Sequence, residues 1–174
     1  YTKFSSSDLI VNITPGTYCD GISITSDTVI AAPGLYHIKG GMVSISGTSV
    51  VTFDGVTLYM TGKGVGLNVK GDSILRLVAP DQGPTKGIAV AMHADAEPAK
   101  ESKFAGSSEV FISGVVHTPN QKITISGDTS GVADLENALF VASEIEFDGA
   151  AEWRWTATDK LPPVVETADA RIVH

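Results

Sequence analysis

Short runs in which apolar and polar residues alternate recur along the chain, and most of them end in glycine. The repeating unit is apolar-x-apolar-x-Gly, found at 43–47, 67–71, 123–127 and 145–149, with serine in place of glycine at 22–26. Strict alternation over such short runs predicts β-strands with one buried face. Glycine supplies the positive φ that a sharp turn needs. The pattern therefore predicts short strands joined by tight turns.

The second apolar residue of each unit recurs at a nearly constant spacing. Ile45 follows Ile24 after 21 residues, Val69 follows Ile45 after 24, and Phe147 follows Ile125 after 22. The 56 residues from Val69 to Ile125 leave room for two or three further periods. Tandem repetition at this spacing, with several short strands in each repeat, is typical of a solenoid.

The amino-acid composition distinguishes a β-strand solenoid from helical and leucine-rich solenoids. The chain has 18 Val and 14 Ile but only 9 Leu, which favours strands over helical or leucine-rich repeats. We therefore predict a single all-β domain over 1–174, a right-handed parallel β-helix of about seven rungs with end caps and one long loop. A β-sandwich is the alternative, because it also combines short strands with regularly spaced turns.

A second motif, Pro-Gly-x-Tyr, occurs at 15–18 and again at 33–36. Pro-Gly is a turn dipeptide, and each copy is followed by a glycine and a short alternating run. The recurrence of the motif after 18 residues is further evidence of internal repetition along the chain.

Four segments depart from the repeat. Residues 1–12 are expected to form an N-terminal cap, because an uncovered sheet edge would pair with other chains. The polar segment Ala94–Ala105 is expected to be the long loop. We expect a turn followed by a strand over Val132–Ser143, with an amphipathic helix as the alternative. Residues 157–174 are expected to turn back at Pro162-Pro163 and lie alongside the body as a return strand.

Charge and cysteine content narrow the classes of partner. The formal net charge is -8, with three arginines and no basic stripe, which argues against nucleic-acid binding and against docking on anionic lipid. No apolar run is long enough to span a bilayer. Because the chain begins at Tyr1 without Met, we interpret it as a mature or trimmed fragment. The single cysteine, Cys19, is expected to be a buried thiol, with an intermolecular disulfide as the alternative.

The search for catalytic chemistry leads to no site. The four histidines lie at spacings that build no local metal site. The aspartates Asp27, Asp72 and Asp128 occupy the same phase of the repeat, on turns that are not neighbours, so turn formation explains them better than a shared calcium ion. We therefore expect no enzyme activity, no catalytic residue, no cofactor and no metal. A carbohydrate-binding or polysaccharide-cleaving β-helix is the alternative.

The most distinctive local feature is Glu152-Trp153-Arg154-Trp155, where alternation directs both tryptophans to one side of a strand. One interpretation is that Trp153 and Trp155 cover the C-terminal end of the hydrophobic column. The other is that they form a contact surface for a partner protein or a glycan.

The order of several segments resembles the C-terminal β-helical region of TadG-like proteins, which are components of tight-adherence (Flp-type) pilus systems with a TadE/TadG-type membrane segment. The segments are PGTYCDGISI (15–24), PGLYHIKGGMVSISG (33–47), GVTLYM (55–60), LVAPDQGPTKGIAV (77–90) and the final RIVH (171–174). The resemblance covers about residues 13–174. The family's membrane segment and the von Willebrand-type domain of some members are absent from this sequence.

The resemblance implies a non-catalytic extracytoplasmic domain, structural and adhesive, in a minor component of such a pilus. Its expected location is the periplasm or the cell surface, with a membrane anchor only through a segment that this chain lacks. The implied partners are other pilus or pilus-assembly subunits, and beyond them a cell-surface glycan or an abiotic surface. The residues expected to contact partners are Trp153, Trp155, Glu97, Lys100 and Lys103.

Overall fold

The structure, a computed structural model, describes residues 2–4, 10–127, 132–150 and 152–157, and all regular secondary structure in these residues is β-strand. The early strands are short, whereas β15 and β16 are long and run through two corners of the fold. The strands are β1 (Thr2–Phe4), β2 (Ile10–Ile13), β3 (Gly16–Cys19), β4 (Ile22–Thr25), β5 (Thr28–Ala31), β6 (Gly34–Lys39), β7 (Met42–Ser46), β8 (Val50–Asp54), β9 (Val56–Thr61), β10 (Lys63–Val69), β11 (Ile74–Val78), β12 (Ile88–Met92), β13 (Glu97–Pro98), β14 (Glu101–Phe104), β15 (Glu109–Gly127), β16 (Val132–Gly149) and β17 (Glu152–Thr156).

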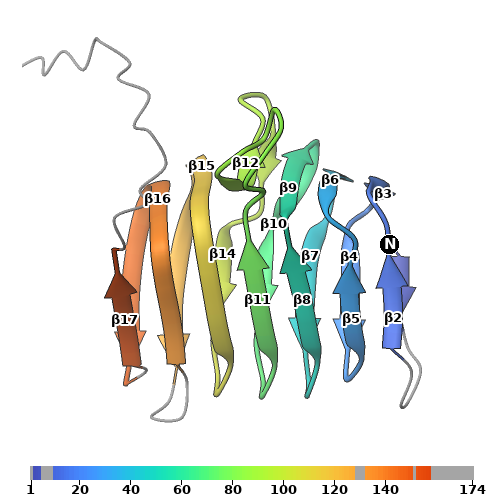
Figure 1. Cartoon of the computed structure of the whole chain (residues 1–174). Helices are drawn as coiled ribbons and strands as arrows, with labels where there is room; N and C mark the ends of the chain where they lie inside the picture. Colours follow the sequence, from blue (N-terminus) through green and yellow to red (C-terminus); the bar gives the residue numbers. More distant parts are fainter. Residues whose placement is uncertain (1, 5–9, 128–131, 151, 158–174) are drawn as a thin grey trace, which may run out of the picture.

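These strands wind into a parallel β-solenoid of about six turns, close to the seven predicted (Figure 1). Every strand pair in the described residues is parallel, so the predicted fold class is confirmed and the sandwich alternative is wrong. Face A consists of β1, β4, β7, β10, β14 and the last parts of β15 and β16. Face B consists of β2, β5, β8, β11, the first parts of β15 and β16, and β17. Face C consists of β3, β6, β9, β12 and the middle parts of β15 and β16.

The repeat unit identified in the sequence forms a column of side chains inside face A. Its members pair turn by turn in the order Ile24, Ile45, Val69, Phe104, Ile125 and Phe147. Two periods separate Val69 from Ile125, one ending at Phe104 and one at Ile125, which agrees with the expected two or three. The first of them is longer than the others, with 35 residues from Val69 to Phe104, because it carries an insertion.

The insertion does not lie where the polar composition placed it. The segment Ala94–Ala105 was expected to be the long loop, but it contains β13 and β14, and Ser102 and Phe104 are buried inside face A. The longest turn within the described ranges is instead 79–87, between β11 and β12. The charged residues of β14, Glu101 and Lys103, lie on its outer side, and they make the segment look polar although its alternate residues face the interior.

The segment Val132–Ser143 is strand, which excludes the helical alternative and agrees with the strand expected in its second part. It lies in β16, where Asn137 has a φ of 51° at the corner between faces B and C. The pairing with β15 shifts at this residue: Ser113 pairs with Glu136 and Gly114 with Ala138. This one-residue insertion in the register is what allows Leu135 and Ala138, three positions apart, both to be buried.

Of the segment predicted as an N-terminal cap, 2–4 and 10–12 are described, and both parts continue the sheet. Strand β1 pairs with β4, and β2 pairs with β5. Of the predicted return strand over 157–174, all but residue 157 lies outside the described residues.

The repeated Pro-Gly-x-Tyr motif is a corner that the tyrosine closes. The hydroxyl of Tyr18 donates to the carbonyl of Thr14 at 2.7 Å, and that of Tyr36 lies 2.9 Å from the carbonyl of Ala32. In both copies the acceptor is the residue just before the proline. The two rings stack with centroids 5.7 Å apart. The motif is thus a local hydrogen-bonded turn that recurs at successive corners of the solenoid.

Candidate functional site

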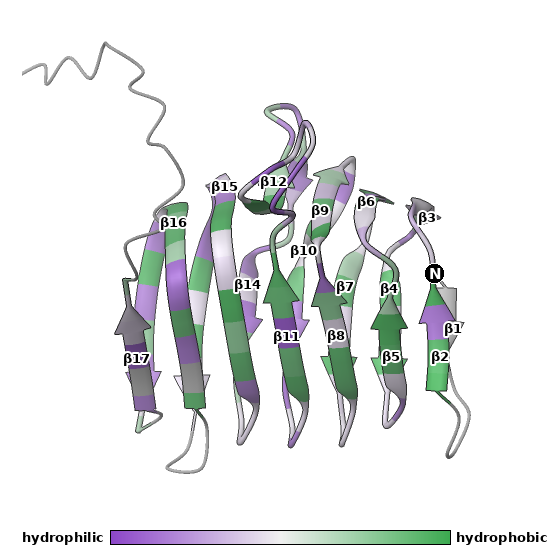
Figure 2. Ribbon diagram, in the orientation of Figure 1, coloured by the Kyte–Doolittle hydropathy of each residue, from purple (hydrophilic) through white to green (hydrophobic). Residues whose placement is uncertain are grey.

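The outer side of face B carries an uncharged surface over β2, β5, β8 and the start of β11. Its members are adjacent by register, Ile10 beside Thr28, then Val50, then Ile74, with Asn12, Ile30 and Thr52 in the next row. We call these seven residues the neutral face. In Figure 2 the ribbons of β5 and β8 are coloured mostly as hydrophobic, which includes both their inward-facing and their outward-facing residues.

Four aliphatic side chains of the neutral face are open to solvent. Ile10 is 59% exposed, Ile30 42%, Val50 37% and Ile74 40%. A sheet with one solvated face normally presents polar residues outward. A contiguous aliphatic patch on a chain of net charge -8 is therefore a feature of an interaction surface.

Toward the C-terminal end the same rows become charged. Arg76 follows Thr52, and its guanidinium lies 4.4 Å from the centre of the Phe111 ring. In the turn beyond, Arg154 pairs with Asp134 at 3.9 Å and with Glu152 at 2.9 Å. The neutral face is thus limited to the first four strands of face B.

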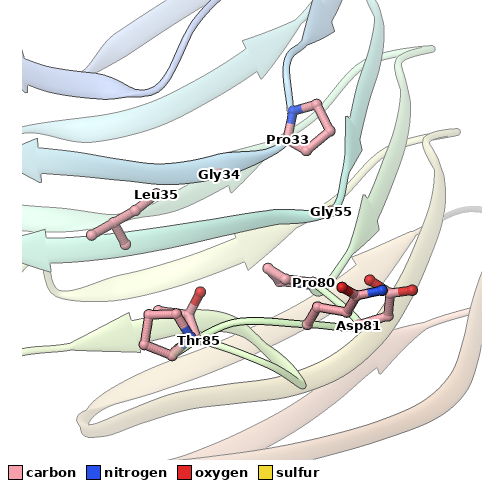
Figure 3. Close-up of a pocket in the computed structure, with 9 residues that line it drawn as sticks. Pro33, Gly34, Leu35, Gly55, Pro80, Asp81 and Thr85 are labelled. Atoms are coloured by element: carbon pink, nitrogen blue, oxygen red, sulfur yellow. The ribbon is translucent and has the colours of Figure 1, made fainter.

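A groove adjoins the neutral face where the chain passes from face B to face C. It lies between the corners at Pro33 and Gly55 and the 79–87 turn, and it comprises two hollows of about 520 and 500 Å³ that share Pro33, Gly55 and Asp81. We call it the corner groove. Figure 3 shows the first of these hollows.

Outside face C, three rings form a row along the solenoid. The rings of His37 and Tyr59 have centroids 5.5 Å apart, and Tyr59 meets His93 edge to face at 6.3 Å. The Nε2 of His37 lies 2.7 Å from the hydroxyl of Thr61. The fourth histidine, His174, is outside the described residues, and the described part of the chain contains no group of three residues suited to hold a metal ion.

Trp155 lies at the end of an inner column of face B, directly above Leu135. Its Nε1–H donates to the carbonyl of Ala138 at 3.1 Å, its ring meets Phe140 edge to face at 5.8 Å, and it is 56% exposed. This position agrees with the interpretation that Trp155 covers the C-terminal end of the hydrophobic column. Trp153 pairs with Ala133 along the strand, while its side chain is outside what the structure describes.

The other residues expected to contact partners lie elsewhere, on an earlier turn. Glu97 in β13 pairs with Lys63 at 3.2 Å, Lys100 is exposed in the turn before β14, and Lys103 points outward from face A between Asn68 and Thr124. The structure therefore does not combine these three residues and Trp155 into one site.

Two further expectations are wrong. Cys19 is exposed, because the inward position in β3 is taken by Tyr18 and alternation turns the next residue outward. Asp27 and Asp72 are not equivalent: Asp27 is buried and lies at the position of Ser49, whereas Asp72 is exposed, one residue earlier in its turn. Asp128 lies outside the described residues.

Sequence reasoning missed a buried polar cluster in the interior. The amide of Gln121 donates to the carbonyls of Val65 at 3.0 Å and Ala99 at 3.3 Å and accepts from the hydroxyl of Ser102 at 2.7 Å. Gln121 is 1% exposed. A Cβ on Gly66 would lie 2.6 Å from the Gln121 amide nitrogen, so the glycine makes room for this cluster. The small residues Gly66 and Ser102 point to this buried cluster only when their proximity across successive turns is known.

No family model, no curated protein and no solved structure matches this chain. Within the described residues, no helix is long and apolar enough to cross a membrane.

Proposed function

We propose that this chain is a non-catalytic, extracytoplasmic structural and adhesive domain in a minor component of a tight-adherence pilus system, and that the neutral face contacts a neighbouring pilus subunit. The neutral face is the observation that carries the proposal. The order of sequence motifs supplies the pilus context.

The physical chemistry of the neutral face suits a protein partner. The centres of protein interfaces are depleted of charged residues, and the neutral face can be covered without removing a charge from water, which would be costly. Its residues project from adjacent parallel strands about 4.8 Å apart. A partner therefore meets an ordered surface whose side chains need little rearrangement.

The test places two lysines in the neutral face. Thr28→Lys with Val50→Lys alters adjacent residues of the neutral face. The matched control, Ser23→Lys with Ser44→Lys, alters adjacent residues on the outer side of face A. Each double variant is expressed in source cells in place of the native protein, and its retention on sheared, purified pili is measured.

The expected result is that the native protein and the face A control remain on the pili, and that retention of the neutral-face variant falls at least about tenfold, a loss of about 1.4 kcal/mol. Circular dichroism should show that both variants keep their strand content. Absence of the native protein from the pili would overturn the proposal, as would equal retention of the two variants.

One observation favours the carbohydrate-binding alternative. The row formed by His37, Tyr59 and His93 presents aromatic and hydrogen-bonding groups side by side, and such groups are typical of small-molecule sites. A glycan array probed with the native protein and with Tyr59→Ala tests it. Binding that Tyr59→Ala abolishes would support this alternative, as would release of reducing ends from an acidic polysaccharide.

A further inference from the structure

The corner groove has a wall that is fixed by its own hydrogen bonds. In the 79–87 turn, the N–H of Gly87 donates to the carbonyl of Pro80 at 2.8 Å and that of Ile88 to Thr85 at 3.0 Å. Both ends of the turn are bonded to the next turn of the solenoid, through Ala79 N–H to Ser113 and Val115 N–H to Gly87, at 2.9 and 2.8 Å. The groove is therefore formed before any ligand arrives.

The surface of the groove is mostly apolar, and its side-chain hydrogen-bond donors are Thr52, Gln82 and Thr85. Three prolines and Leu35 line it, and Figure 3 shows Pro33, Leu35 and Pro80 around the hollow. Proline has no N–H group, and the carbonyl of Pro80 already accepts from Gly87, so the prolines offer a ligand mainly apolar contact. Leu35 is 45% exposed, which leaves an aliphatic surface available on one side.

Two carboxylates, Asp54 and Asp81, are the only charged side chains that line the two hollows of the groove. Both are exposed, and neither forms an ion pair within the described residues. Lys86, the basic residue of the 79–87 turn, does not line either hollow. The groove thus combines an apolar lining with negative charge that has no counter-charge in the described structure.

From this combination we propose that the corner groove binds an extended cationic segment of a partner protein, in which lysine or arginine alternates with proline or aliphatic residues. The ammonium or guanidinium groups pair with Asp54 and Asp81, and the apolar residues pack on Pro33, Leu35 and Pro80. The inference goes beyond the proposed function. Ile30 and Thr52 of the neutral face also line the second hollow, but the test below measures peptide binding and does not require the pilus context.

The test uses the full chain and a short synthetic peptide in which lysine alternates with proline and valine. Isothermal titration measures its affinity, and the same peptide with glutamate in place of lysine is the charge-reversed probe. Asp54→Asn with Asp81→Asn removes the charge of the groove. The matched control, Asp72→Asn with Glu136→Gln, removes the same net charge from acidic residues that line neither hollow. This control is needed because a chain of net charge -8 attracts any cation.

We expect the lysine peptide to bind at least about tenfold more tightly than the glutamate peptide, and the groove variant to lose about tenfold in affinity for it. The control variant should stay within about twofold of the native protein, and added salt should weaken binding because exposed charges are screened. Leu35→Ser should weaken binding with little change in its salt dependence. The inference is overturned if the native chain does not bind the lysine peptide, if it binds both peptides equally, or if the groove and control variants behave alike.

Discussion

Two copies of the same sequence unit differ sharply in burial. In the inner turns, Val43 and Ile45 are fully buried, whereas Ile145 and Phe147 at the C-terminal end are 38% and 56% exposed. Both pairs alternate in the same way and lie in the same two columns. The difference shows that a side chain in a solenoid is buried by the turns on both sides of it, and its own strand contributes only the direction in which it points.

The outer surfaces of the two regions differ as well. The two rows of the neutral face are uncharged, whereas on face A β15 and β16 carry acidic and basic residues in adjacent positions. Lys122 lies 3.0 Å from Glu144 and 2.9 Å from Glu146. The hydrogen bonds that the Lys122 ammonium donates to Glu146 and Glu144 raise the pKa of Lys122, and the pKa of Glu146 is lowered mainly because it accepts a hydrogen bond from Lys122. On the outer side of face B itself, Arg76 and Arg154 occupy the corresponding positions toward the C-terminal end, so the neutral face is confined to the early turns.

The largest effect should come from truncating the same residue type in an inner and in an end turn. Ile123 and Ile145 are neighbours in one column but are 1% and 38% exposed. We expect Ile123→Ala to lower the free energy of unfolding by about 2–4 kcal/mol, because it leaves a cavity between two turns. Ile145→Ala should cost less than about 1 kcal/mol. Urea titration followed by circular dichroism measures both, and equal losses would contradict the comparison.

A second variant examines the junction between the two regions. Gln121→Ala leaves the buried carbonyl of Val65 without its side-chain donor and removes the acceptor of Ser102. The expected loss is about 1–3 kcal/mol, because unsatisfied buried polar groups are costly. Gln82→Ala, in the exposed 79–87 turn, is the control and should leave the urea midpoint unchanged. A midpoint that moves equally in the two variants would show that the buried cluster is not a structural link.

The repeated tyrosine corner allows a comparison within the early turns. Tyr36 is fully buried, and its hydroxyl lies 3.0 Å from the carbonyl of Ile13 as well as near Ala32. Tyr36→Phe should cost about 1 kcal/mol, and Tyr18→Phe, at the more open copy, about half of that. The measurement is again urea titration at neutral pH. A larger loss of stability in Tyr18→Phe than in Tyr36→Phe would contradict the expectation that the hydroxyl of the inner copy contributes more.

Alkaline pH should weaken the inner copy more than the outer one, although burial raises the pKa of Tyr18 as well. Burial raises the pKa of Tyr36 to about 12, the nearby Tyr18 adds to the rise, and the hydrogen bond with the Ala32 carbonyl opposes it. Because the folded-state pKa lies above the ordinary value of 10.0, this contribution to stability is complete below about pH 10 and is lost as the pH rises toward 12. The midpoint temperature of thermal unfolding should therefore fall more steeply above about pH 10 in the native protein than in Tyr36→Phe. Parallel falls in the two proteins would argue against this role of Tyr36.

The smallest effect is expected from the exposed ion pairs at the C-terminal end. Lys122→Met should lower the urea midpoint only slightly, because pairs open to solvent contribute little. The difference from the native protein should disappear at high salt, which screens such pairs. A large or salt-independent loss would mean that the side chain acts through packing instead.

Much of the fold follows from local patterns. Alternation over 22–26, 43–47 and 67–71 predicts the strands of face A, and the steps between Ile24, Ile45 and Val69 predict their parallel stacking. Glycine at the end of each unit also has a structural reason. Gly71 has a φ of 80°, and a Cβ on it would lie 2.9 Å from the carbonyl oxygen of Gly47.

The candidate site could be predicted far less well. The apolar residues Ile30 and Val50 sit in runs that are apolar on both sides of the strand, and alternation alone does not say which side is exposed. Cys19 was assigned to the interior by its residue type, but the position of Tyr18 turned it outward. The corner groove depends on where the 79–87 turn folds back onto Pro33 and Gly55, which are more than twenty residues away.

The sequence by itself determined that the chain coils, because regularly spaced aliphatic residues reach the interior on every turn and stack on their equivalents. The tertiary structure alone decided which of these residues lie open at the C-terminal end, which outer row stays uncharged over adjacent strands and where the long turn forms a groove. Each of these features depends on contacts between separate turns. A local pattern specifies the direction of a side chain, and its surroundings are set by the turns above and below it.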